Sequence, residues 1–226
     1  MRGRAPLSKR TLLLSVAGAV LVLLVLAQVL LPRIAASEIS SRVSRYGEVA
    51  SVSVSAWPAL KLLWGHADSV KVRARSLALD PAQAAKLVWE GRDVGSEDVS
   101  AESVKVGSLQ LSDATLRKRG SWLSAFASAD QAAVKAALPE GFEVRLLSSR
   151  DGQVEVQASG GLFGVGTGVD AVALASGGRL VAHPLGFLIE GLQLAIFSDP
   201  HVYVEGVSAS VPPSGGYRLG MSASLR

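Results

Sequence analysis

The chain has 226 residues, of which 49% are hydrophobic, 5% aromatic and 19% charged, and its formal net charge is +4. Four of its 23 basic residues precede Pro32, and the rest of the chain carries equal numbers of basic and acidic residues, so the high pI does not indicate nucleic-acid binding. The absence of cysteine excludes disulfides, thiolate chemistry and cysteine-based metal sites.

The N-terminus joins a basic tail, residues 1–10, to an uncharged apolar segment, residues 11–31. As a helix, this segment measures about 32 Å, against about 30 Å for the hydrocarbon core of a bilayer. We therefore predict a single transmembrane anchor, with the tail in the cytoplasm and one extracytoplasmic domain over residues 33–226. A signal peptide is the alternative, and in that case the segment would be cleaved.

A predicted helix over residues 33–46 leads into the most informative stretch, residues 49–79. Apolar and polar residues alternate there in two runs, which predicts two strands with one apolar face each. In the first run Val52 and Val54 alternate with serines. In the second run Val70 and Val72 alternate with the basic residues Lys71, Arg73 and Arg75. Residues 58–65, bracketed by Trp57 and Trp64, predict a short apolar helix that begins with Pro58 and ends before Gly65.

Two interpretations of this stretch are open. It is either a core plug beneath a hairpin or a lipid-facing lip. The second interpretation predicts an apolar lipid-binding set: Val52, Val54, Trp57, Leu60, Leu63 and Trp64. It also predicts that the basic residues Lys71, Arg73 and Arg75 contact anionic head groups.

The same stretch resembles the LmeA-like phospholipid-binding family of actinobacteria. The resemblance lies in the order of a strand, the motif Trp57-Pro58-Ala59-Leu60, an apolar run, Gly65 and the motif Val70-Lys71-Val72. It extends from about Ile34 to the C-terminus, where residues 183–187 and a following strand pair resemble the end of the pattern. Asp199-Pro200 stands where that family usually has an Asp-Gly turn. The resemblance implies a fold like that of tubular lipid-binding proteins, and binding of a phospholipid, with an inositol phospholipid as one candidate, in service of envelope assembly.

Further along the chain, Asp80-Pro81 predicts the start of a helix. The acidic residues 90–102 lack the order of a calcium loop and predict a solvated loop. Residues 104–111 predict a strand with a bulge near Gly107-Ser108. The basic triplet at 117–119 predicts either a charged loop or a head-group contact.

Residues 128–138 predict a helix, with Ser128 and Gln131 spaced as a capping box, and its small apolar side chains favour burial in the hollow of a curved sheet. From Phe142 onward, short strands alternate with turns near residues 149–152, 177–178, 198–200 and 212–216. The predicted fold class is therefore α+β: a strongly curved antiparallel sheet wrapped around one or two helices, after a single transmembrane helix.

The motifs of enzymatic chemistry are missing from the sequence. Its three histidines are isolated, and it contains no nucleophile elbow and no phosphate-binding loop. We therefore predict no enzyme, cofactor or metal. Two functions stay open: membrane-anchored binding of phospholipid in an apolar groove, serving lipid transfer or envelope glycolipid assembly, or a structural or interaction ectodomain with a filled core.

Overall fold

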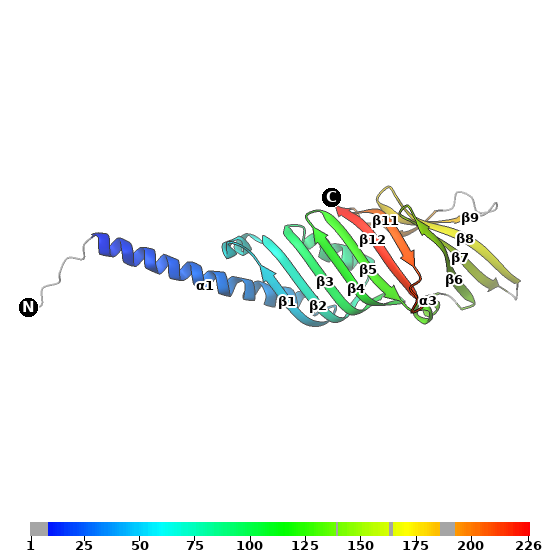
Figure 1. Ribbon diagram of the computed structural model, residues 1–226, viewed down its shortest axis with the longest axis horizontal. Helices are drawn as coiled ribbons and strands as arrows, with labels where there is room; N and C mark the ends of the chain where they lie inside the picture. The colour runs from blue at the N-terminus through cyan, green and yellow to red at the C-terminus, as the bar shows by residue number, and fades with distance from the viewer. Residues whose placement is uncertain (1–8, 139, 163–164, 186–192) are drawn as a thin grey trace, which may run out of the picture.

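The computed structural model describes residues 9–138, 140–162, 165–185 and 193–226. It is elongated: helix α1 (Lys9–Val43) extends from one end, a seven-stranded sheet follows, and a five-stranded sheet forms the other end (Figure 1). The predicted anchor and the predicted helix over 33–46 are one continuous helix, with Pro32 inside it. Most of the basic tail, residues 1–8, lies outside the described residues.

The first sheet has the strand order β1-β2-β3-β4-β5-β12-β11. Its strands are β1 (Gly47–Ser55), β2 (Ala67–Leu79), β3 (Val94–Val106), β4 (Leu109–Arg119), β5 (Trp122–Ala129), β12 (Tyr217–Leu225) and β11 (Val202–Ser210). Helix α2 (Pro81–Glu90) connects β2 to β3, which is why this one pair runs parallel while the others are antiparallel. Asp80 accepts from the backbone N–H of Gln83 at 2.7 Å and so caps α2, as Asp80-Pro81 predicted.

The second sheet is an antiparallel meander in the order β10-β9-β8-β7-β6. Its strands are β6 (Phe142–Arg150), β7 (Gln153–Leu162), β8 (Val165–Ser176), β9 (Arg179–Leu185) and β10 (Leu194–Phe197), and α3 (Gln131–Ala137) precedes it. The turns of this sheet cover the edge of the first. The N–H groups of Val204 and Val207 on β11 donate to the carbonyls of Gly178 and Gly152, at 2.9 and 3.0 Å. These two N–H groups of the edge strand are therefore hydrogen-bonded within the chain and cannot pair with a strand of another molecule.

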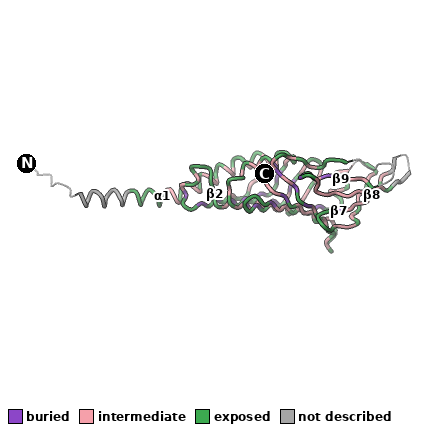
Figure 2. Tube along the Cα trace, turned by 90° about the horizontal axis from the view of Figure 1, so that it is seen from above, coloured by how far each residue is buried: buried purple, intermediate pink, exposed green. Residues whose placement is uncertain are grey.

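A row of cross-strand neighbours crosses all seven strands of the first sheet and is buried on each. Buried residues, purple in Figure 2, are confined to short stretches of the chain. The row runs Val54, Val70, Glu97, Lys118, Leu123, Ala223 and Val204. At one end, Ala35, Ala36 and Ile39 of α1 pack against it, and Ala85 of α2 packs near the other. The core is therefore a thin layer between one sheet face and two helices.

The mixed α+β class is confirmed, but the predicted single curved sheet is wrong. The described residues form two sheets, neither of them strongly curled. The helix predicted in the hollow is α3, which is capped by Asp130 rather than Ser128 and buries none of its residues. The helices that cover the sheet are α1 and α2. The predicted strand pair around residues 198–200 is also divided, because β10 and β11 belong to different sheets, and part of the 183–187 segment lies outside the described residues.

The acidic stretch is a strand rather than a solvated loop. Residues 94–106 form β3, which places Asp98 and Glu97 on opposite faces. Asp98 accepts two hydrogen bonds from the guanidinium of Arg119, at 2.9 and 3.1 Å, on the outer face. On the inner face Glu97 neighbours Lys118. The basic triplet thus lies on β4, and Gly107-Ser108 is the turn between β3 and β4 rather than a bulge.

Candidate functional site

The segment between β1 and β2 folds as the sequence predicted. Residues 59–64 form the short 3₁₀ helix η1 (Ala59–Trp64), preceded by Pro58 with φ −67°. Gly65 ends it in the left-handed conformation, φ 77°, and its N–H donates to the carbonyl of Leu62 at 3.1 Å. We call residues 57–65 the lip.

The lip presents large apolar side chains that nothing in the described part of the chain covers. Trp57 and Trp64 are each 72% exposed and Leu63 is 64% exposed, whereas Ala59 at the base of η1 is buried. Soluble surfaces seldom gather such residues without a partner. The exposed side chains therefore point to an apolar surrounding.

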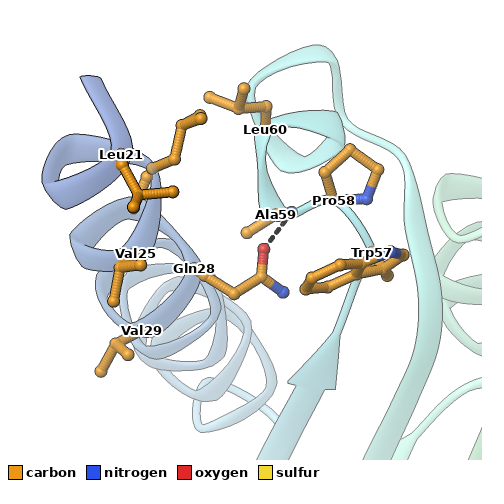
Figure 3. A pocket seen from close by; sticks show the side chains of 10 residues that line it. Leu21, Val25, Gln28, Val29, Trp57, Pro58, Ala59 and Leu60 are labelled. Carbon is orange, nitrogen blue, oxygen red and sulfur yellow. Dashed lines mark hydrogen bonds between the residues drawn. The ribbon is translucent and has the colours of Figure 1, made fainter. Parts of the chain in front are cut away.

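Gln28 joins the lip to α1. Its side-chain amide donates to the carbonyl of Ala56 at 3.0 Å. Its side-chain oxygen accepts from the N–H of Ala59 at 2.8 Å (Figure 3). Gln28 was not among the predicted site residues. The available signal was a polar residue inside a membrane-length apolar helix, which by default marks a functional or structural contact.

A groove of about 450 Å³ runs between α1 and the lip. One wall is Leu21, Leu24, Val25, Ala27, Gln28 and Val29 of α1, and the other is Trp57, Pro58, Ala59 and Leu60. Leu60 lies at the end near Leu21, and Trp57 lies at the end near Gln28 (Figure 3). Apart from Gln28, the groove is lined by apolar side chains.

Asp68, at the start of β2, holds the lip through two further hydrogen bonds. Its carboxylate accepts from the N–H of Trp57 at 2.5 Å and from the ammonium of Lys61 at 3.4 Å. The hydrogen bond from Trp57 lowers the pKa of Asp68, and Lys61 acts in the same direction against partial desolvation. Asp68 is therefore ionised at neutral pH, and this keeps both contacts.

The predicted site residues separate into three places. Trp57, Leu60, Leu63 and Trp64 are together on the lip, whereas Val54 and Val52 belong to the core cluster beneath α1. The basic residues of β2 lie exposed on the opposite face of the sheet, where Arg75 pairs with Glu48. Among the described residues, Lys71 and Arg73 form no ion pair.

No cluster of three His, Asp or Glu side chains suited to a metal ion occurs within the described residues. The described part of α1 that is apolar and long enough to cross a membrane is residues 20–43, and no residue in it is fully buried, although Ala35, Ala36 and Ile39 are partly covered by the sheet. Either a membrane anchor or a signal sequence has these properties. What the site offers is an apolar surface and groove beside an apolar helix.

Comparisons with known proteins agree with this chemistry. No curated protein and no solved structure matches the chain. A protein-family model, however, matches residues 22–210, which include most of the groove and the whole lip. The match begins inside α1, earlier than the predicted resemblance at about Ile34. The chain belongs to the LmeA-like phospholipid-binding family.

Proposed function

We propose that the chain is a membrane-anchored phospholipid-binding protein whose lip enters the outer leaflet of the membrane that α1 crosses. The observation that carries this proposal is the attachment of the lip to α1 through Gln28. At that level the other sides of α1 are apolar and open, with its leucines and valines between residues 20 and 30 exposed by 45% to 65%. A lip fixed beside such a surface shares its hydrocarbon surroundings.

The depth of the lip follows from helix geometry. If residues 11–31 fill the hydrocarbon core, Gln28 lies about 5 Å below its outer edge, at a rise of about 1.5 Å per residue. Leu60 lies beside Leu21, deeper along the same helix. Leu60 and Leu63 then contact acyl chains, and Trp57 lies near the polar boundary that indole rings favour. The basic N-terminal tail puts the two sheets on the extracytoplasmic side.

Lys71 and Arg73 are proposed to meet anionic head groups. Lys71 lies between Val70 and Val72, which share a core cluster with Ala35 and Ile39 of α1. Those helix residues stand about 6–12 Å above Leu31, close to the polar layer of roughly 5–7 Å that covers the hydrocarbon. Arg75 lies farther along the strand and is already paired with Glu48, so we expect the weakest effect there. The bound phospholipid would serve lipid transfer or envelope glycolipid assembly.

Substitutions on the lip test this proposal. We expect Leu63→Ala and Trp64→Ala in the full chain to lower the phospholipid retained in mild detergent several-fold, as counted by native mass spectrometry. Because both side chains are exposed, the free energy of unfolding should change by less than about 1 kcal/mol. Leu77→Ala is the matched control: this leucine is buried, so its truncation should cost about 2–5 kcal/mol without reducing lipid retention by the folded protein.

The opposite pattern would reject the proposal. If Leu63→Ala and Trp64→Ala lower the unfolding midpoint as Leu77→Ala does, and leave retention unchanged, the lip is part of the core. The chain would then act as an interaction ectodomain.

A further inference from the structure

We propose that the groove between α1 and the lip holds one acyl chain of an outer-leaflet phospholipid, entering sideways from the bilayer. This inference rests on the proposed function and extends it. In it α1 is one wall of the lipid site as well as the tether, so the site is incomplete without the membrane helix.

The walls of the groove have the chemistry of a hydrocarbon site. Six lining residues come from α1 and four from the lip, and Gln28 is the only polar side chain among them. The nitrogen and the oxygen of the Gln28 amide are each hydrogen-bonded to the backbone, at Ala56 and Ala59, so the polar group of this wall is partnered within the protein. A volume of about 450 Å³ is within the range of about 300–1,000 Å³ typical of small-ligand sites.

The surroundings of the groove favour an acyl chain as its occupant. Water is excluded because a cavity with apolar walls offers it too few hydrogen-bond partners. At this level the exposed sides of α1 are surrounded by lipid in the proposed arrangement, so lipid is the available occupant.

The two ends of the groove differ in polarity and so orient the bound lipid. Gln28 and Trp57 lie at one end (Figure 3), where the N–H of Trp57 donates to Asp68, which also accepts from Lys61. The other end, at Leu21 and Leu60, has no charged lining residue. The head group therefore lies at the Gln28 end, which is nearer the membrane surface, and the acyl chain extends towards Leu21.

A pair of valines on α1 gives a matched test. Val25 lines the groove and Val22 does not, and both are 58% exposed. We expect the full chain, reconstituted with phosphatidylglycerol and then extracted in mild detergent, to retain about one phospholipid in native mass spectrometry. Val25→Trp should fill the groove and lower this retention at least five-fold. Val22→Trp adds the same ring to the same helix and should leave retention unchanged.

Equal retention by Val25→Trp and Val22→Trp would overturn the groove as the site while leaving phospholipid binding intact. A wild-type chain that retains no phospholipid would overturn both proposals. Loss of a bound protein chain, rather than of lipid, in Val25→Trp would show that the groove packs a helix and would also overturn the inference. If Val25→Trp alters the circular-dichroism spectrum, the pair Leu24→Trp and Leu23→Trp, of which only Leu24 lines the groove, gives the same comparison.

Discussion

Glu97 and Lys118 are two ionisable residues in the middle of an otherwise apolar buried row. The Lys118 ammonium donates to the carbonyls of Arg92, at 3.3 Å, and Val94. The carboxyl group of Glu97 packs so closely against Gly91 that a Cβ there would approach its oxygen to 1.9 Å. Burial raises the pKa of Glu97 to about 7, although the charge of Lys118 opposes the shift. The sheet therefore has a titrating group in its core near neutral pH.

This pKa predicts how stability depends on pH. A carboxyl group whose folded-state pKa is raised contributes stability below its unfolded pKa of about 4.5, and that contribution is lost as pH rises through about 7. Glu97→Gln should remove this loss of stability and raise the free energy of unfolding at pH 8 by up to about 3 kcal/mol. At pH 4 the same substitution should change the free energy of unfolding little. Unfolding of the sheets, followed by circular dichroism in mild detergent, measures the difference.

Glu102→Gln on the same strand is the control, because Glu102 is exposed, and it should be nearly neutral at both pH values. Destabilisation by Glu97→Gln at pH 8 would mean that Glu97 is charged in the folded protein and stabilised by Lys118.

At the scale of elements, the local sequence predicted turns and short segments whose conformation depends on the backbone preferences of nearby glycines and prolines. The turn at Gly177-Gly178 was predictable because both glycines adopt left-handed φ values, 58° and 78°. The lip was predictable for the same reason, since Pro58 and Gly65 define its ends within one short segment. The groove was not predictable from local sequence, because it depends on hydrogen bonds of Gln28 with Ala56 and Ala59, which are 28 and 31 residues away in the chain.

The same distinction explains the errors in the predicted sheet. The acidic residues of β3 were predicted to form a loop because their cross-strand neighbours, Arg119 and Lys118, belong to the next strand, and local sequence does not show this pairing. The division of β10 and β11 between two sheets depends on pairing with Leu180 and with Leu225, which no local pattern encodes. Strand positions were therefore readable from alternation, but sheet membership was not.

In the turn that covers β11, we expect two adjacent glycines to differ in how much stability is lost when each is replaced by alanine. A Cβ at Gly178 would lie 2.2 Å from the ring of Tyr203, whereas a Cβ at Gly177 would meet nothing within 4 Å. Both positions have left-handed φ, so each alanine costs about 1–2 kcal/mol of backbone strain. Gly178→Ala should cost a further 1–3 kcal/mol or so, because the ring must move and the contact with β11 loosens. Thermal unfolding of the two variants measures this, and equal midpoints would contradict it.

At the scale of the whole molecule, the elements follow one another along a single axis. The strand nearest α1 is β1, the sheet continues through β5 to β11, and the second sheet lies farthest from the helix (Figure 1). In the proposed arrangement this order along the axis becomes a distance from the bilayer. The lip is at the membrane end, and β6 to β9 are at the distal end.

The four tryptophans report on this arrangement. Trp57 and Trp64 are on the lip, Trp89 stacks on His201 at 4.2 Å between ring centres, and Trp122 is exposed on β5. In vesicles with brominated acyl chains, we expect strong fluorescence quenching for the double variant Trp89→Phe/Trp122→Phe. The complementary variant Trp57→Phe/Trp64→Phe should show little quenching. Similar quenching of both variants would show that the molecule does not stand with its lip in the bilayer.

The continuity of α1 across Pro32 has a mechanical consequence. In the proposed arrangement α1 continues from the bilayer into the folded domain, where Ala35, Ala36 and Ile39 pack on the sheet, and no hinge of loop residues lies at the boundary. In a bilayer thinner than its apolar length, such a helix relieves hydrophobic mismatch by tilting. The domain must then lean with it as one lever, and the far sheet moves most. Local bilayer thickness would thus set how far the distal end of the protein stands from the membrane.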